Sequence, residues 1–125
     1  MIYSQEKFAL HTKEKIMKDA FIRFLNLKNT LAIESEPLDL TSMKLLEICV
    51  VRSDEGKRFT ITEAMALTHV ASPATIHRKL LQLLDSGYVT FDFETNNRRT
   101  KYITPTAKSD EYFSKLGAIL LQSAS

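Results

Sequence analysis

One stretch of this sequence, residues 72–101, restricts the possible folds more than any other. It opens with Ser72, whose hydroxyl can accept a hydrogen bond from an unpaired amide in a first helical turn. Pro73 falls at the first helical position, where no amide donor is needed. Gly87 suits the left-handed conformation that ends many helices. The sequence therefore predicts a helix that begins after Ser72 and ends near Gly87.

The predicted helix has one apolar face and one polar face. At about 100° per residue, its large apolar side chains gather on the side that must face a core. These are Ile76, Leu80, Leu83 and Leu84. The opposite face is polar and carries no acidic residue before Asp85. Its residues, with those on its flanks, are Thr75, His77, Arg78, Lys79 and Gln82.

A β-hairpin is expected directly after this helix, because apolar and polar residues alternate with the period of a half-buried strand. The inward set is Val89, Phe91 and Phe93, and the outward set is Tyr88, Thr90, Asp92 and Glu94. Thr95, Asn96 and Asn97 tolerate turn geometry, and the return strand ends at Thr104. Arg98, Arg99 and Lys101 therefore place three cations at or near an exposed hairpin tip.

The residues upstream complete a helix-turn-helix unit. Phe59, Thr60 and Ile61 are predicted to form a short strand, residues 62–67 a short helix, and residues 68–71 the connection between two helices. A second helix that presents Thr, Arg and Lys outward, with a free N-terminus, meets the requirement for insertion into a DNA major groove. A basic hairpin beside it would reach flanking phosphates or the minor groove.

This ordered combination resembles the winged helix-turn-helix of the MarR family of bacterial transcriptional regulators. The resemblance covers residues 38–116 and depends on the order of the parts rather than on one motif. Its landmarks are Leu40 and Thr41, Leu45 and Leu46, the Ser72 helix, Gly87, the hairpin end at residues 97–101, and Thr106. The family often has Asp in place of Asn97 and Gly in place of Ser109, and most members are longer. The resemblance implies repression that a small ligand relieves at the junction of DNA-binding lobes and dimer helices.

Composition limits the other possibilities. At 125 residues, the chain has the size of one domain, so we expect residues 1–125 to form a single winged-helix domain. With 44% hydrophobic residues, three Gly and three Pro, it should be compact and helix-rich. One Cys permits no intrachain disulfide and favours a reducing interior. No signal peptide or membrane span is recognisable, so a cytoplasmic location without membrane contact is expected.

Helices are expected on both sides of the winged helix-turn-helix, which is assigned to residues 38–104. Residues 4–29 should form a helix with a broad apolar face built from Ile16, Met17, Ala20, Phe21, Phe24, Leu25 and Leu27. Residues 30–39 are predicted to be a loop broken by Pro37, followed by a helix from the cap Thr41 to Arg52. Residues 105–122 should form a last helix with a stripe of Tyr112, Phe113, Leu116, Ile119 and Leu120.

The predicted fold class is therefore mainly α with a small β-hairpin wing: a winged helix-turn-helix with N- and C-terminal dimerisation helices. Both terminal helices are expected to meet a second copy of the chain. The alternative for the N-terminal helix is that it only covers the winged helix.

The candidate DNA-binding residues are Ser72, Pro73, Thr75, His77, Arg78, Lys79, Arg98, Arg99 and Lys101. Those at the helix N-terminus would approach base edges, Arg78 and Lys79 would contact bases or phosphates, and the hairpin cations would hold the flanking backbone. The alternatives are an ordinary solvated helix face and an ordinary charged turn. A formal charge of +2 is a weak signal, so binding must depend on where the cations are placed.

Other chemistries receive little support. The spacing of His11, His69 and His77 matches no zinc site, so no metal is expected. Cys49 could be a redox sensor, but a lone Cys in an apolar helix is usually inert packing. No nucleophile turn and no Gly-rich phosphate loop occurs, so neither an enzyme nor a cofactor is expected.

The sequence thus predicts a transcriptional regulator that binds duplex DNA, as a homodimer on a palindromic operator, with a possible small-molecule effector. Two alternatives stay open: a winged helix used for protein contact as a subunit of an assembly, and the DNA-binding module of a plasmid or phage replication or partition system. The modest net charge favours the protein-contact alternative slightly. The absence of acids on the outward helix face favours DNA.

Overall fold

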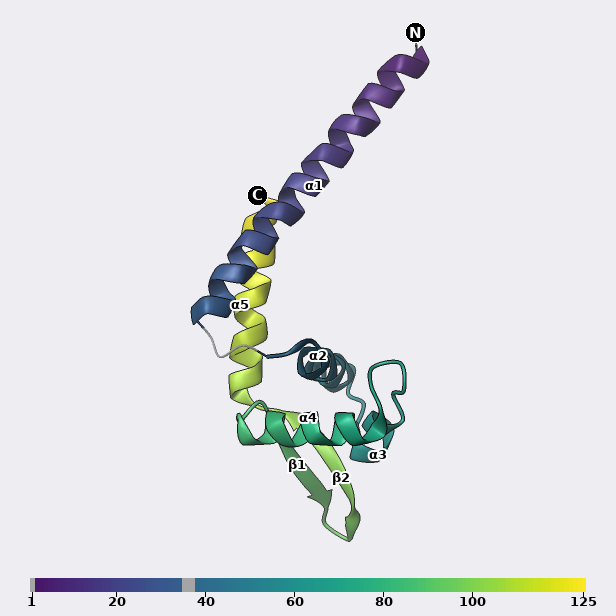
Figure 1. Cartoon of the computed structure of the whole chain (residues 1–125), viewed down its shortest axis with the longest axis vertical. Coiled ribbons are helices and arrows are strands. Elements are labelled where there is room, and N and C mark those ends of the chain that lie inside the picture. Colours follow the sequence, from purple (N-terminus) through teal and green to yellow (C-terminus); the bar gives the residue numbers. More distant parts are fainter. Residues whose placement is uncertain (1, 35–37) are drawn as a thin grey trace. The chain divides into compact units, whose positions relative to one another are not determined.

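The computed structural model describes residues 2–34 and 38–125 and confirms the predicted fold class (Figure 1). The described residues are mostly helical, with one antiparallel hairpin. The elements, in chain order, are α1 (Ile2–Glu34), α2 (Leu40–Asp54), α3 (Ile61–Met65), α4 (Pro73–Asp85), β1 (Val89–Glu94), β2 (Asn97–Pro105) and α5 (Ala107–Ala124). They divide into two compact units. One is residues 38–113, and the other contains α1 and the C-terminal part of α5.

The core of the unit formed by residues 38–113 lies where α2, α4 and the hairpin meet. Its buried members are Leu45, Leu46, Cys49, Phe59, Ala64, Ile76, Leu80, Leu83, Tyr88, Val89 and Ile103. The predicted inward face of α4 is confirmed for Ile76, Leu80 and Leu83. It is wrong for Leu84, which is 36% exposed, because this residue lies at the edge of the apolar stripe in the last helical turn.

Both predicted ends of α4 are confirmed. The Ser72 hydroxyl accepts a hydrogen bond from the Thr75 amide at 3.3 Å, and Pro73 is the first helical residue. Gly87 follows the helix with φ +82°, a backbone conformation that side chains with a Cβ rarely adopt. The residues at which α4 begins and ends are therefore set by its own flanking residues.

The start of α2 differs from the prediction. Asp39, and not Thr41, is the N-cap: its Oδ1 accepts from the Ser42 amide at 2.8 Å. The helix then runs two residues past the predicted end, to Asp54. A carboxylate is at least as good a cap as a hydroxyl, and Asp39 has a second partner that the local sequence does not reveal.

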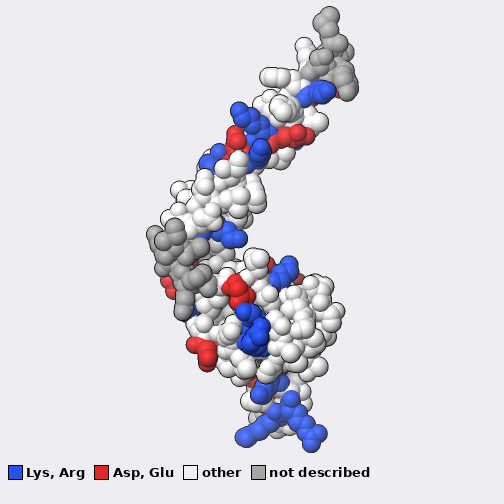
Figure 2. All heavy atoms as spheres, in the orientation of Figure 1, with Lys and Arg blue, Asp and Glu red and all other residues white. Residues whose placement is uncertain are grey.

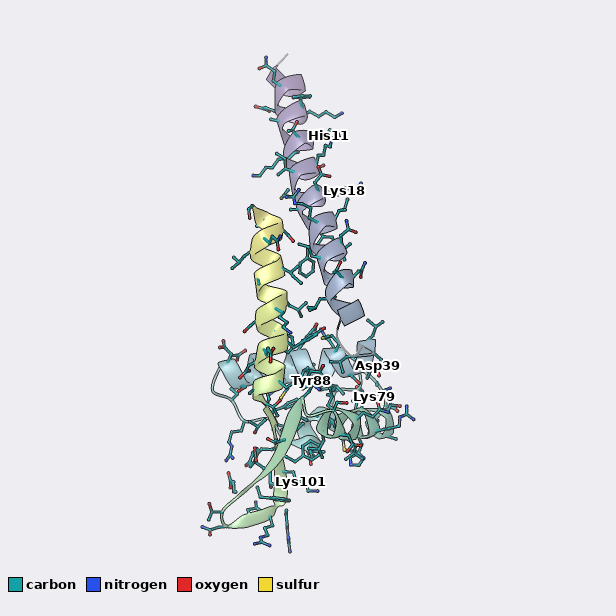
Figure 3. All side chains as sticks on the ribbon, turned by 90° about the vertical axis from the view of Figure 1, so that its left-hand side faces the viewer. His11, Lys18, Asp39, Lys79, Tyr88 and Lys101 are labelled. Atoms are coloured by element: carbon teal, nitrogen blue, oxygen red, sulfur yellow. The ribbon has the colours of Figure 1, made fainter. Side chains whose placement is uncertain are left out.

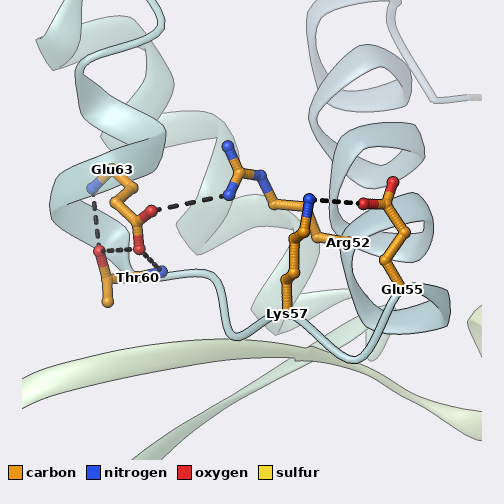
Figure 4. Close-up of polar contacts among 5 residues, drawn as sticks. All are labelled: Arg52, Glu55, Lys57, Thr60 and Glu63. Carbon is orange, nitrogen blue, oxygen red and sulfur yellow. Dashed lines mark hydrogen bonds and ion pairs between the residues drawn. The ribbon is translucent and has the colours of Figure 1, made fainter.

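The predicted strand at Phe59, Thr60 and Ile61 is wrong. It is reduced to a single bridge between Thr60 and Tyr102, supported by a 2.7 Å hydrogen bond from the Ile103 amide to the Phe59 carbonyl. Thr60 instead begins α3 through a capping box: its hydroxyl accepts from the Glu63 amide while Glu63 Oε1 accepts from the Thr60 amide (Figure 4). The helix was predicted to begin at Thr62, one residue after its actual start.

Thr60→Ala is expected to lower the free energy of unfolding by about 1 kcal/mol, because the mutation leaves the Glu63 amide in the first turn of α3 without its side-chain acceptor. Glu63 also approaches Arg52 of α2 at 3.6 Å, so this cap connects two helices (Figure 4). Urea unfolding would measure the change. Thr62→Ala is the control, since Thr62 is exposed on the same helix and does not cap it. Equal losses for the two variants would contradict the prediction.

The hairpin has the predicted strands but a different placement of two aromatic rings. Tyr88, assigned to the outward set, is buried and packs edge-on against Tyr112 at 6.1 Å, because α5 covers that side. Phe93, assigned to the core, is 47% exposed, since the hairpin extends beyond the core at this point. Val89 is buried and Phe91 is half-buried, as predicted.

The other unit consists of long helices. α1 is longer than the predicted residues 4–29: Thr30 to Glu34, assigned to a loop, are helical because Leu31, Ala32 and their neighbours contain no helix breaker. Pro37, the expected breaker, lies outside the described residues.

α5 begins two residues later than predicted, and Pro105 ends β2 as expected. The Arg23 guanidinium donates to the Ser123 carbonyl at 2.9 Å, which ties α1 to the end of α5.

Much of the predicted apolar face of α1 is exposed in the single chain. The exposed members of that face are Ile16, Met17, Phe21 and Leu25. Outside the predicted face, Phe8, Leu10 and Ile22 of α1 and Leu120 and Leu121 of α5 are also exposed. Across the described part of the chain, no helix combines the length and the apolar character that a membrane crossing requires.

Candidate nucleic-acid interface

The outward face of α4 is polar, as predicted. His77 and Arg78 are exposed, and Thr75 is half-buried one turn earlier. The Ser72 hydroxyl donates to Thr75 Oγ1 at 2.9 Å while it accepts from the Thr75 amide. This leaves the Thr75 hydroxyl hydrogen available for an external acceptor. Pro73 is exposed beside this pair. The N-terminus of α4 therefore presents hydrogen-bonding groups that are already held in place.

The tip of the hairpin carries the largest exposed group of cations on the face that Figure 2 shows, at the lower end of the view. Arg98 and Arg99 are exposed, and neither forms an ion pair within the described residues. The strand register explains their position. Phe93 pairs with Lys101 but the next residue, Glu94, pairs with Asn97, so residues 98–100 bulge out of the ladder. Bulges commonly redirect side chains next to binding sites.

Asn97 stiffens this bulge. Its Oδ1 accepts from the Arg99 amide at 3.0 Å and its Nδ2 donates to Thr100 Oγ1 at 3.2 Å. The amide side chain of Asn97 can therefore organise the turn, at a position where the MarR family, which the sequence resembles, often has Asp. These two hydrogen bonds use the Arg99 backbone amide and the Thr100 hydroxyl, so neither of them involves a guanidinium group.

Glu94, the acidic residue nearest the hairpin tip, forms an ion pair with Arg58 of the segment between α2 and α3. Glu94 Oε1 lies 2.8 Å from Arg58 Nη1 and accepts from the Tyr102 hydroxyl at 2.9 Å. The Arg58 guanidinium also lies 3.7 Å from the centre of the Tyr102 ring. The hydrogen bond to Glu94 raises the pKa of Tyr102, because it stabilises the protonated phenol. As a result, Glu94 is occupied and does not compete for Arg98 and Arg99.

One hollow of about 630 Å³ joins the two predicted contact surfaces. It is lined by Thr60, Ile61, Thr62, Met65, Ala74, His77, Arg99, Thr100 and Lys101. Thus α3, the first turns of α4 and the basic part of β2 face the same space. Thr60, Thr62 and Thr100 were not predicted as site residues. Thr62 lies in the predicted short helix and Thr100 in the predicted return strand, but only the tertiary structure brings their hydroxyls to the same hollow as α4.

Lys79 has a different environment from the other predicted cations. Its Nζ lies 2.8 Å from Asp39 Oδ2, and the two labelled side chains meet between α4 and the start of α2 in Figure 3. The hydrogen bond from Lys79, followed by that from the Ser42 amide, lowers the pKa of Asp39. Lys79 therefore already has an anionic partner within the protein.

The remaining reactive side chains suggest no further site. Burial raises the pKa of Cys49 to about 11, so its thiol is protonated at neutral pH, and it donates to the Ile103 carbonyl at 3.7 Å. Within residues 2–34 and 38–125, no three His, Cys, Asp or Glu side chains are grouped closely enough to hold a metal ion.

The fold is that of solved winged-helix regulators. The transcriptional regulator Tm0710 from Thermotoga maritima matches with a TM-score of 0.63 and 15% identity, over 90% of this chain and 75% of that chain. RV1404 from Mycobacterium tuberculosis matches with a TM-score of 0.59 and 11% identity, over 98% of this chain and 75% of that one. MepR from S. aureus, solved with ethidium bromide, has the same TM-score and identity, over 94% and 75%.

No protein-family model matches the sequence, and no curated protein is detectably similar to it. The likeness to the solved structures therefore concerns the fold. That fold is the winged helix-turn-helix of MarR-family regulators, as the resemblance in sequence implied.

Proposed function

We propose that this protein is a sequence-specific duplex DNA-binding transcriptional regulator. The observation that carries the proposal is the hollow shared by α4 and the wing, in which His77 faces the same space as Arg99 and Lys101. A helix for the major groove and a basic hairpin for the adjacent backbone must lie side by side to bind one duplex. The solved transcriptional regulator with the same fold supports the assignment.

The roles of the residues follow from their positions. Ser72, Pro73, Thr75 and His77, at the start of α4, would approach base edges, and Arg78 would contact a base or a phosphate. Arg98, Arg99 and Lys101 would hold the flanking backbone or enter the minor groove. Binding would depend on local placement, because residues 38–113 contain ten basic and ten acidic side chains and so have no net charge.

The same neutrality supports a second candidate, a winged helix that binds an acidic protein partner as a subunit of an assembly. The two candidates predict different results with duplex DNA. A protein-contact subunit would bind duplexes weakly and without sequence preference, whereas a regulator would select a motif. A replication or partition module would also select a motif, but that motif would recur in an array near an origin instead of next to promoters.

The proposal includes a homodimer. The exposed apolar residues of α1 and α5 support it, because exposed apolar surface of this extent commonly marks a protein interface. In a two-fold dimer the recognition helices would lie about 34 Å apart, or a multiple of that distance, and the operator would be palindromic. A small-molecule effector is also proposed, since two proteins of the same fold have been solved with small molecules: the heme sensor protein PefR from Streptococcus agalactiae with heme, and MepR with ethidium bromide.

Selection of bound duplexes from a random pool, with the purified full chain, tests the proposal. We expect enrichment of a motif with two-fold symmetry, because each recognition helix would read one half-site. Sedimentation of the protein with the selected duplex would give the number of chains bound. Failure to retain any duplex at low salt would remove DNA from the proposal, and an enriched motif without symmetry would remove the two-fold dimer.

A further inference from the structure

The DNA contacts assigned above leave one ion pair unexplained, that between Lys79 of α4 and Asp39 at the start of α2. Lys79 belongs to the helix proposed to enter the groove, one turn beyond Thr75. Its side chain is nevertheless 19% exposed and ends 2.8 Å from Asp39 Oδ2. The partner residues are separated by 40 positions in the sequence, so tertiary packing brings them together.

The two carboxylate oxygens of Asp39 accept different sets of hydrogen bonds. Oδ1 accepts from the Ser42 amide at 2.8 Å, which caps α2, and Oδ2 accepts from Lys79. Oδ2 also accepts from the Ser42 hydroxyl at 3.2 Å. The cap fixes the carboxylate on α2, so the anion stays in place whatever Lys79 does. A DNA phosphate would have to compete with a fixed, hydrogen-bonded carboxylate for this lysine.

We propose that Asp39 is an internal counter-ion that withholds Lys79 from the DNA backbone. The inference rests on the proposed DNA-binding function and deepens it. Lys79 then releases no condensed counter-ion when a duplex binds, and it contributes nothing to the salt dependence of affinity. Arg78 and the wing arginines, which have no ion pair within the described part of the chain, make the backbone contacts instead. Asp39 thereby sets how many phosphates the surface can engage.

Asp39→Asn separates the two functions of this side chain. Asn is as good an N-cap as Asp, so α2 keeps its start while Lys79 loses its anionic partner. With a duplex of mixed sequence as the probe, affinity would be measured by fluorescence anisotropy over a range of salt concentrations. We expect the log–log salt slope to become steeper by about 0.9, and affinity near 0.1 M salt to rise on the order of fivefold.

Two further variants complete the test. Lys79→Met in the natural background should leave the salt slope unchanged, and Lys79→Met combined with Asp39→Asn should return the slope to that of the natural protein. Asp54→Asn is the matched control, because it removes the same charge from the exposed C-terminal end of α2 and should not change the slope. Urea unfolding would establish that each variant is folded at the assay temperature.

The failures are distinguishable. If the natural protein binds duplexes but Asp39→Asn has an unchanged slope, or Lys79→Met alone flattens the slope by about one unit, the counter-ion role is overturned and the proposed function stands. If the natural protein binds no duplex at low salt, both are overturned.

Discussion

Replacing Arg98 and Arg99 together by Ala is expected to weaken binding to every duplex, whatever its sequence. Both guanidinium groups are exposed on the bulge of β2, and Asn97 shapes that bulge through backbone and hydroxyl contacts. If each contacts a phosphate, the log–log dependence of affinity on salt should flatten by about one to two units. Near 0.1 M salt this corresponds to a loss on the order of 50-fold. Salt titration with duplexes of different sequence would measure the effect.

The control for this prediction must remove the same charge elsewhere. Lys44 and Lys57 are exposed and line a separate hollow formed by α2 and the turn that follows it. The pair Lys44→Ala and Lys57→Ala should leave the salt slope within its experimental error. An unchanged slope in the Arg98 and Arg99 variant would exclude the wing from the interface, and equal flattening in both variants would show that net charge alone matters.

Arg78→Ala is expected to cost about 1–3 kcal/mol on the selected motif and less on duplexes of mixed sequence. Arg78 is exposed in the second turn of α4, on the face without acidic neighbours, so its planar group is free to form two hydrogen bonds to one base. Losing those bonds removes discrimination as well as charge. Competition binding between the selected motif and mixed-sequence DNA would give the ratio of affinities.

Arg78→Lys distinguishes base reading from phosphate contact. It retains the positive charge but cannot reproduce the paired hydrogen bonds of a guanidinium. Affinity for mixed-sequence DNA should therefore stay close to that of the natural protein, while the preference for the motif falls. Equal losses on both kinds of duplex in the Ala variant would show that Arg78 contacts the backbone and that α4 does not read sequence through it.

The features that could be predicted depend on residues close together in the chain. Ser72 and Pro73 start α4 and Gly87 ends it, because capping hydrogen bonds and a positive φ are satisfied within a few residues. The alternation from Val89 to Glu94 likewise indicates a strand whatever it packs against. The order of these elements is enough to indicate a winged helix-turn-helix.

The wrong predictions concern helix caps, buried aromatic rings and a strand for which the neighbouring sequence allowed more than one outcome. Asp39 and Thr41 could each cap α2, and Lys79, 40 positions away, supplies the second partner that Asp39 has. Tyr88 and Phe93 exchange their expected environments because α5 covers one end of the hairpin and the other end extends beyond the core. Thr60 fits a strand by propensity, but the capping box with Glu63 begins a helix there.

The sequence by itself therefore determined α4, the strands of the hairpin and the faces of both that carry cations, since short-range hydrogen bonding and periodicity decide these features. Only the tertiary structure decided which cations stay free. It pairs Lys79 with Asp39 and Glu94 with Arg58, and it leaves Arg98 and Arg99 on a bulge beside the hollow of α4. The physical reason is that a charge is neutralised by whatever lies within a few ångströms, and that distance is set by the packing of elements remote in sequence.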